Sequence, residues 1–347
     1  VPQKLVETDG TPGTENAVSC VSIEHKLGVH ASPTAVLDYD DATGFLIGQE
    51  NCGLEHMFIM MNAARFSVGV QGVAISDRAY QRALAYARGR VQSRPVKGLG
   101  EDAVPIIDHP DVRRMLLRMR SLTEGGRAMA AATAGLLDVA HHGDDPEARA
   151  QAEFMVPLVK GFCSERAVEV ASLGVQIHGG MGFIEETGAA QHYRDARILP
   201  IYEGTTAIQA NDLLGRKVMR DGGATARLFA SRIAQTEAQL ASGDASARAI
   251  GTSLAQARSA YETALDWMLE NSRKNIDGTF AGSVPFLMLS GTLAAGWMLA
   301  KGALAAHAAC AAGQDSVFMT RKIATALFFA RHTLPACRAE QTRILLG

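Results

Sequence analysis

The chain has 347 residues, of which 47% are hydrophobic and 20% charged, and its net charge is −2. This composition is typical of a folded chain with a sizeable core, and it excludes an intrinsically disordered protein. Basic and acidic residues are interleaved, so no basic stripe indicates a nucleic-acid or membrane-surface partner. The five cysteines form no CxxC pair or zinc motif, and no signal peptide opens the sequence, which favours a reducing, cytoplasmic location.

Residues 1–55 carry short runs that are typical of β-strands. The runs at 18–23 and 34–39 are rich in residues that favour strands, and Gly, Pro and Asn turns separate them. Two or three strands rarely form a stable unit alone. We therefore expect a partial β-domain whose remaining strands lie outside this sequence or come from another chain.

From residue 54 onwards, apolar residues recur at a spacing of three to four, which predicts helices. We expect three of them, over about 54–90, 108–137 and 146–177. A Gly/Pro-rich connection at 95–105 precedes the second helix, for which Asp108 is a candidate cap and Pro110 suits the first turn. Pro157 predicts a kink or a boundary in the third. Such long helices with short breaks predict an antiparallel bundle over 56–219.

After the turn residues 220–223, Ala-rich segments predict an additional helical domain over 224–347. The expected helices cover about 224–241, 246–275, 282–312 and 315–335. Residues 282–300 contain no charge and are just long enough to cross a membrane. Because this stretch contains Pro285 and several Gly, Ser and Thr residues, and ends at Lys301, we favour a buried bundle helix and expect no membrane span.

A glycine-rich turn is expected at the end of the third helix. Residues 176–182 read Gln-Ile-His-Gly-Gly-Met-Gly. Gly179 and Gly180 allow a close approach of the backbone to a pyrophosphate, since glycine has no Cβ in the way. The run is not a GxGxxG after a strand, so it does not indicate a Rossmann fold. We interpret His178 as a packing residue, because no carboxylate lies at an orienting spacing.

Residues 201–209, Ile-Tyr-Glu-Gly-Thr-Thr-Ala-Ile-Gln, place one carboxylate just before another helix. A carboxylate in a partly desolvated setting can act as a general base. The backbone N–H groups of Glu203 and Gly204 are available as oxyanion donors beside it. With the glycine turn, this stretch suggests a phosphate cradle beside a base that abstracts a proton α to a carbonyl. The structural alternative is that Glu203 only favours the dipole of that helix.

These two stretches, with Tyr-Arg-Asp-Ala-Arg at 193–197 between them, closely resemble the C-terminal signature of the flavin-dependent acyl-CoA dehydrogenase family. Further matching blocks at 51–54, 62–65 and 86–92 extend the resemblance over about residues 16–217. The blocks at 22–30, 57–66 and 182–191 are similar to the bacterial branch that includes 3-methylmercaptopropionyl-CoA dehydrogenase. That branch carries an additional helical C-terminal domain, which matches residues 224–347.

The resemblance implies a mainly α fold. Its parts are the C-terminal helical bundle of the family, at 56–219, preceded by part of a β-domain and followed by the extra helical domain. The family's N-terminal helical domain and the first strands of its β-domain have no counterpart, so the chain resembles a C-terminal fragment. We expect it to bind FAD poorly and to lack turnover by itself.

The implied reaction is the FAD-dependent α,β-dehydrogenation of an acyl-CoA thioester to the trans-2-enoyl-CoA. Glu203 matches the base that removes the α-proton, while the β-hydrogen leaves as a hydride to flavin N5. Its backbone N–H helps to hold the thioester carbonyl, and Arg65 and Gly204 lie on the substrate side. Some relatives carry the base beside the arginine matched by Arg65, where this chain has Ala64.

The resemblance also implies the contacts with the FAD cofactor, which are Arg90, Gln92, Gln176, Gly179, Gly180, Thr205 and Thr206. In the family the pair matched by Arg90 and Gln92 typically reaches the FAD of a neighbouring subunit, which implies a homodimer or homotetramer. The implied partners are the acyl-CoA and an electron-transfer flavoprotein as acceptor. This chain has Ser93-Arg94 where the family usually has Phe-Gly, so its flavin contacts differ there.

Two other functions remain open at this point. An acyl-CoA oxidase uses the same base and flavin but passes the electrons to oxygen. A non-catalytic flavoprotein or helical scaffold keeps the fold without the chemistry. The retention of Glu203 favours an enzyme over the scaffold.

Overall fold

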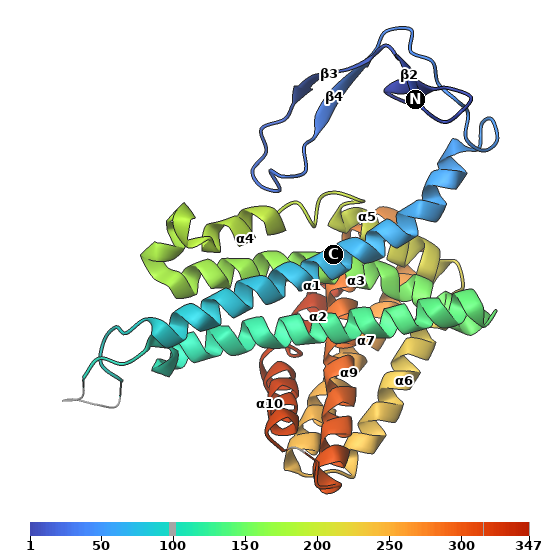
Figure 1. Ribbon diagram of the computed structural model, residues 1–347. Helices are drawn as coiled ribbons and strands as arrows, with labels where there is room; N and C mark the ends of the chain where they lie inside the picture. Colours follow the sequence, from blue (N-terminus) through green and yellow to red (C-terminus); the bar gives the residue numbers. More distant parts are fainter. Residues whose placement is uncertain (97–101, 315, 347) are drawn as a thin grey trace. The chain divides into compact units, whose positions relative to one another are not determined.

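The computed structural model describes residues 1–96, 102–314 and 316–346 (Figure 1). Residues 1–63 and 64–347 form two compact units, which are described separately below. Part of the Gly/Pro-rich connection, at 97–101, and the expected start of a helix at 315 lie outside the described residues. The domain bounds expected from the sequence stay predictions.

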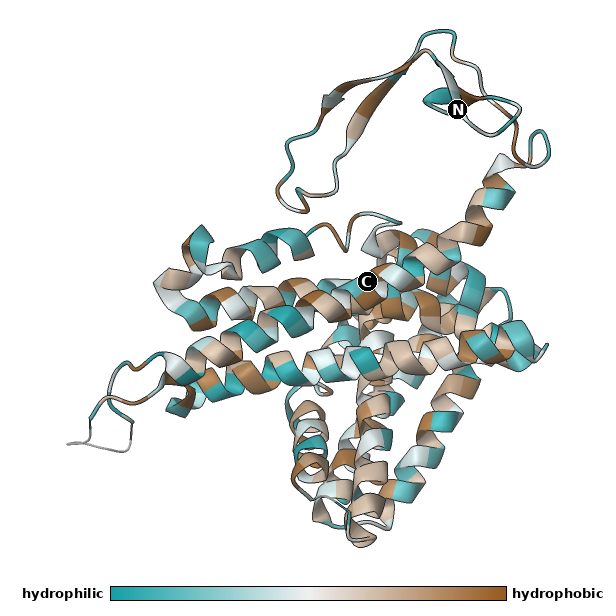
Figure 2. Ribbon diagram, in the orientation of Figure 1, coloured by the Kyte–Doolittle hydropathy of each residue, from teal (hydrophilic) through white to brown (hydrophobic). Residues whose placement is uncertain are grey.

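The first unit consists of two antiparallel hairpins and the first turns of a helix. Strands β1 (Lys4–Val6) and β2 (Pro12–Glu15) form one, and β3 (Val18–Ile23) and β4 (Ala35–Tyr39) form the other. The second pair matches the two predicted runs. The first pair was not predicted, because a three-residue strand is too short to show alternation. Figure 2 shows hydrophobic residues along β3 and β4, and the side chains of Val21, Ile23 and Leu37 are exposed.

The second unit is helical, and its first layer contains α1 (Gly53–Gly89, from Ala64 onwards), α2 (Pro110–His142) and α3 (Pro146–His178). A Cβ added at Gly69 or Gly72 would lie 2.7 Å from a backbone carbonyl oxygen of α3. The backbones of α1 and α3 are therefore in direct contact at these two glycines, which no larger residue allows. Figure 1 shows α2 running alongside α3, to which it packs closely.

Two local expectations for these helices concern Asp108 and Pro157, and the one for Asp108 was wrong. Asp108 does not cap α2, because it ends the 3-10 turn η1 (Ile106–Asp108) and pairs with Arg113 at 3.2 Å, and the N-cap position belongs to His109. Of the two alternatives expected at Pro157, the boundary is excluded, since α3 continues through this residue to its end, and the kink stays a prediction. Pro157 is buried within the core, where packing on all sides compensates for its one missing backbone hydrogen bond.

Short elements connect the bundle to the C-terminal helices. They are η2 (Gly179–Phe183), η3 (Glu185–Thr187), α4 (Ala189–Ala196), α5 (Thr206–Asn211) and the π-helical η4 (Asp212–Met219). The remaining helices are α6 (Ala224–Ala241), α7 (Ala245–Asn271), α8 (Ile276–Ala281), α9 (Ser283–Ala311), α10 (Ser316–His332) and α11 (Ala336–Leu346). Figure 1 shows α6, α7, α9 and α10 lying side by side.

The C-terminal helices differ from expectation in two places. The single helix predicted over 246–275 stops at Asn271, and Asn275 caps α8 by accepting from the N–H of Gly278 at 2.9 Å. The helix α11 lies beyond the last predicted segment, after Pro335 has ended the preceding turn.

Two described helices, α1 and α9, are long and apolar enough to cross a membrane by length and composition. In α9, 78% of the most apolar window is buried inside the unit, and α9 packs against α2, α3, α7, α10 and α11. This confirms the interpretation of α9 as a central helix of the bundle.

Candidate functional site

Glu203 lies in a strained turn between α4 and α5. Its φ is 54°, and Gly204 follows with a φ of 90°. A non-glycine residue in the left-handed region costs on the order of 1–3 kcal/mol, and such residues gather at functional sites. The turn is closed where the N–H of Thr206 donates to the carbonyl of Pro200 at 3.0 Å. The Glu203 side chain is half-buried there.

The start of α5 is capped by another residue. Thr205 occupies the N-cap position, and its hydroxyl accepts from the N–H of Ile208 at 3.4 Å. The cap is therefore not Glu203, which weakens the purely structural interpretation of its carboxylate. Within the described ranges, the backbone N–H groups of Glu203 and Gly204 donate to no acceptor. Two unpaired donors beside one carboxylate form the arrangement that a developing oxyanion needs.

A buried lysine supports this turn from α3. The ammonium of Lys160 donates to the carbonyl of Gly204 at 2.5 Å, and the Lys160 side chain exposes no surface. Burial lowers the pKa of Lys160 to about 8, while the carboxylates of Glu165 and Glu203 oppose this effect and Arg65 adds to it. Sequence reasoning missed Lys160, although a lone lysine inside the apolar run 154–163 was a usable signal.

Three further contacts hold the segment in place. The hydroxyl of Thr206 donates to Glu165 at 2.5 Å, so this hydroxyl hydrogen is already engaged within the protein. Tyr202 donates to the side chain of Gln71 on α1. The fully buried Gln209 donates from Nε2 to the carbonyl of Gly204 at 3.3 Å. The turn is thus fixed to α1, α3 and α5, as the orientation of a catalytic carboxylate requires.

Arg65 is buried rather than open to solvent. It is 7% exposed, and its Nη1 lies 3.4 Å from Oδ2 of Asp212 in η4. Its Nε has no hydrogen-bond partner in the part of the chain that the structure describes. The substrate-side role expected from the resemblance stays a prediction, and Asp212 is the partner that the sequence alone did not reveal.

The glycine turn expected after the third helix is present at the end of α3. Gly179 has a φ of 60°, and a Cβ added at Gly179 or Gly180 would meet nothing within 4 Å. Both glycines and Gln176 are exposed, so backbone and side chain are accessible to a ligand. His178 is buried, contacts the carbonyl of Gly174 at 2.7 Å and stacks on Tyr86 at 4.3 Å, which supports its interpretation as a packing residue.

Arg90 and Gln92 follow the end of α1 and are both exposed. The backbone of Gln92 pairs with Val104, and that of Arg90 accepts from Ile106 at 2.8 Å. Because Tyr86 stacks on His178, the end of α1 lies beside the end of α3. The structure thus brings Arg90 and Gln92 to the same end of the bundle as the glycine turn.

The glycine turn and Glu203 are not adjacent, which corrects the expectation that a phosphate-binding turn lies beside the general base. Tyr202, next to Glu203, contacts Gln71, whereas the glycine turn lies beside Tyr86. Fifteen residues of helix separate these two contacts on α1, which is roughly 22 Å at 1.5 Å per residue. Sequence proximity was misleading, because α4 and the loops around it carry the chain back along the bundle.

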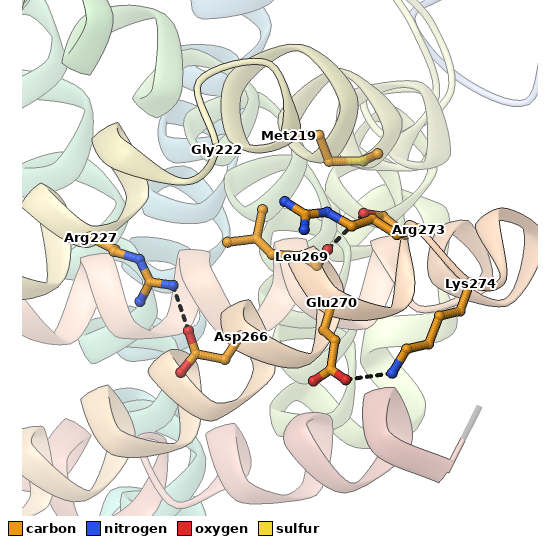
Figure 3. Close-up of a pocket in the computed structure, with 9 residues that line it drawn as sticks. Met219, Gly222, Arg227, Asp266, Leu269, Glu270, Arg273 and Lys274 are labelled. Carbon is orange, nitrogen blue, oxygen red and sulfur yellow. Dashed lines mark hydrogen bonds and ion pairs between the residues drawn. The ribbon is translucent and has the colours of Figure 1, made fainter.

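A separate, solvent-open pocket of about 530 Å³ lies between the end of α7 and the turn before α6 (Figure 3). Figure 3 shows four of its charged side chains in pairs, Arg227 with Asp266 at 2.7 Å and Lys274 with Glu270 at 2.5 Å. Arg273 also lines the pocket. The pocket shares no lining residue with the Glu203 turn or the glycine turn, so we assign it no role in the reaction.

Two family models match this chain. Residues 51–219 match the model described as acyl-CoA dehydrogenase, C-terminal domain. Residues 229–347 match the model described as acetyl-CoA dehydrogenase C-terminal like.

Several curated proteins are similar over nearly the whole chain. A 3-methylmercaptopropionyl-CoA dehydrogenase of Ruegeria pomeroyi is 65% identical over 99% of this chain and 59% of its own length. A broad-specificity linear acyl-CoA dehydrogenase of Mycobacterium tuberculosis is 34% identical over 96% of this chain and 58% of its own length. The chain thus spans about three fifths of these relatives.

Solved structures confirm the mainly helical fold. An acyl-CoA dehydrogenase of Bacillus anthracis complexed with FAD is similar with a TM-score of 0.76 and 24% identity, over 95% of this chain and 57% of that one. Caenorhabditis elegans ACDH-11 in complex with C11-CoA is similar with a TM-score of 0.73 and 22% identity, over 95% and 56%.

Proposed function

The chain belongs to the acyl-CoA dehydrogenase family, and on that premise we propose that it carries the catalytic base and cofactor contacts for the FAD-dependent α,β-dehydrogenation of an acyl-CoA thioester. The observation that carries the proposal is the Glu203 turn. A strained backbone holds one carboxylate and two unpaired N–H groups together, and Lys160 on α3 donates a hydrogen bond to the carbonyl of Gly204.

Glu203 has one task in this proposal. Its carboxylate accepts the proton from the α-carbon of the thioester, and the N–H groups of Glu203 and Gly204 stabilise the negative charge that develops on the carbonyl oxygen. When bound, FAD supplies the acceptor for the hydride that leaves the β-carbon with its electron pair. One proton and one hydride therefore leave, and a trans double bond remains.

The glycine turn fits a dinucleotide in one specific respect. A Cβ at Gly179 or Gly180 would project into free space, so their backbone is open to a pyrophosphate. Arg90, at the same end of the bundle, supplies a positive charge. The separation from Glu203 supports the implied arrangement in which Arg90 and Gln92 contact the FAD of a neighbouring subunit. This assignment, the electron-transfer flavoprotein and the homo-oligomer remain proposals.

The test is Glu203→Gln in the natural full-length chain. We expect acyl-CoA-dependent reduction of an artificial acceptor to fall by about 10²–10⁴-fold, the usual contribution of a general base. Flavin absorbance and thermal stability should not change. Glu262→Gln on α7 is the matched control, because it makes the same exchange in the C-terminal helices, outside the Glu203 turn. If Glu203→Gln keeps its turnover, the base lies elsewhere.

A further inference from the structure

A cavity of about 320 Å³ lies among α2, α3, α6 and α9. It shares no lining residue with the Glu203 turn or the glycine turn. Its apolar wall is made of Leu136, Phe154, Met155, Phe229, Trp297 and Met298. The volume is at the lower end of the range of about 300–1,000 Å³ for small-molecule pockets. It therefore suits a small, largely apolar ligand and is too small for a complete CoA ester.

One polar side chain in this cavity lacks a partner. Gln151 is 7% exposed, and its Oε1 accepts a hydrogen bond from the guanidinium of Arg232. Because a guanidinium can only donate, this bond fixes the orientation of the amide. Its Nε2 then has no hydrogen-bond partner within residues 1–96, 102–314 and 316–346. A buried amide donor without a protein acceptor is unfavourable, and a ligand that brings an acceptor into the cavity satisfies it.

The charges around the cavity select the kind of acceptor. Arg232 and Lys301 both line it, and Arg232 also pairs with Glu147 at 2.6 Å. The ammonium of Lys301 lies 5.4 Å from the ring centroid of Trp297, with no carboxylate partner in the described part of the chain. Two cations with one carboxylate leave an excess of positive charge, which favours an anionic acceptor.

We propose that this cavity binds a monocarboxylate with a hydrophobic tail of medium length. The carboxylate accepts from Nε2 of Gln151 and pairs with Lys301, and the tail packs against the aromatic side chains of Phe154, Phe229 and Trp297. The site is separate from the proposed catalytic site, and its occupancy does not depend on turnover. Its test is therefore independent of the proposed function.

The probe is octanoate, titrated into the protein and followed by calorimetry and by tryptophan fluorescence. A Trp297→Phe variant identifies the part of the emission change that comes from Trp297, because it removes this indole and leaves the other tryptophans in place. We expect saturable binding with a change in Trp297 emission, and at least about tenfold weaker binding of octan-1-ol. Gln151→Leu and Lys301→Met should each weaken octanoate binding by about tenfold or more.

A cavity-filling variant separates this site from binding elsewhere. Gly135 lines the cavity within α2, and a Cβ added there meets nothing within 4 Å. Gly135→Leu therefore places a side chain in the cavity while raising helix propensity, so the variant should fold. Gly302→Leu on α9 is the control, since Gly302 has equal space but does not line the cavity.

We expect Gly135→Leu to abolish octanoate binding and Gly302→Leu to retain it. Three results would overturn the proposal: no saturable binding, equal affinity for octan-1-ol, or full affinity in Gly135→Leu. Loss of octanoate binding in Gly135→Leu with retained acyl-CoA turnover in the natural full-length chain shows that the two sites are distinct. Competition of octanoate with acyl-CoA that persists in Gly135→Leu would place octanoate in the catalytic site and contradict the assignment.

Discussion

The ammonium of Lys160 donates to the carbonyl oxygen of Gly204 at 2.5 Å. Gly204 directly follows Glu203, which we propose as the catalytic base. Lys160 is in the middle of α3 and exposes no surface. The backbone of the strained turn is therefore attached to a rigid helix rather than to another loop. We conclude that α3 determines where the Glu203 carboxylate lies.

The first prediction concerns the pH dependence of stability. The pKa of Lys160 is about 8 in the folded chain, against the ordinary value of 10.5 that it regains on unfolding. Between these values the unfolded chain binds more protons, so the contribution of Lys160 to the free energy of unfolding rises as the pH rises from about 8 to 10.5. Below that window Lys160 is charged in both the folded and the unfolded chain, so it does not make the free energy of unfolding depend on pH.

Urea unfolding of the wild type and of Lys160→Met measures this contribution. The difference between their unfolding free energies should rise with pH inside the window and be flat below it, because Glu165, Glu203 and Arg65 are common to both proteins. Parallel curves at all pH values would show that Lys160 does not titrate with a lowered pKa.

The contrast between α3 and the catalytic turn shows what the sequence could and could not predict. The three-to-four spacing of apolar residues located α1 and α3 to within about one residue at each end, and α2 except for its last five residues, because burial of one face dominates such long helices. Pro157 does not end α3, since tertiary packing outweighed the loss of one hydrogen bond. The spacing of apolar residues predicts a helix well, but it does not predict whether tertiary packing tolerates a proline inside that helix.

The site was predictable only in part for a related reason. The Glu203 and Gly179 stretches were visible as motifs, but their roughly 22 Å separation along α1 arises from the path of the chain through α4. Lys160 was missed although a lone lysine in an apolar run is a local signal, because its partner Gly204 is 44 residues away in sequence. Asp212 has no such signal, and its partner Arg65 is 147 residues away. Long-range pairing can be recognised only once the fold is known.

The second prediction is that function and stability conflict at Glu203. Its φ of 54° is strained for any residue with a Cβ and free of strain for glycine. Glu203→Gly should therefore be more stable than Glu203→Ala by about 1 kcal/mol. Chemical denaturation of the two variants gives this difference, and neither should turn over acyl-CoA in the natural full-length chain. A more stable alanine variant would mean that the turn does not hold this conformation.

The third prediction separates cofactor contact from folding in the glycine turn. Gly180→Ala places a methyl group in free space, so its stability should change by less than about 0.5 kcal/mol. The methyl group would stand where we propose that the pyrophosphate approaches, so FAD affinity in the natural full-length chain should fall at least tenfold. Equilibrium dialysis of FAD measures this effect.

The matched control is Gly182→Ala, two residues further on. A Cβ there would lie 2.3 Å from the carbonyl oxygen of Val175 and 3.0 Å from Cβ of His178. Overpacking of this kind costs about 1–3 kcal/mol, so this variant should lose stability. Unchanged FAD affinity in Gly180→Ala would remove the glycine turn from the proposed cofactor site.

The fourth prediction concerns Arg65 and Asp212, whose side chains are 8% and 10% exposed and 3.4 Å apart. Removal of one partner leaves a buried charge without compensation, so Asp212→Leu should destabilise the chain by about 3–5 kcal/mol. The double variant Arg65→Met/Asp212→Leu buries no charge and should recover most of that loss. Denaturant unfolding of the wild type and of the single and double variants forms a double-mutant cycle, which measures the interaction energy between Arg65 and Asp212.

An exposed ion pair is the reference for this cycle. Arg194 and Glu185 lie 3.0 Å apart, with Glu185 77% exposed, and Glu185→Gln should change stability by less than about 1 kcal/mol because water screens such a pair. If Asp212→Leu costs no more than this, Arg65 is not held as a buried charge. Its guanidinium would then be free for the substrate-side role that the resemblance implies, and the activity of Arg65→Met would become the decisive measurement.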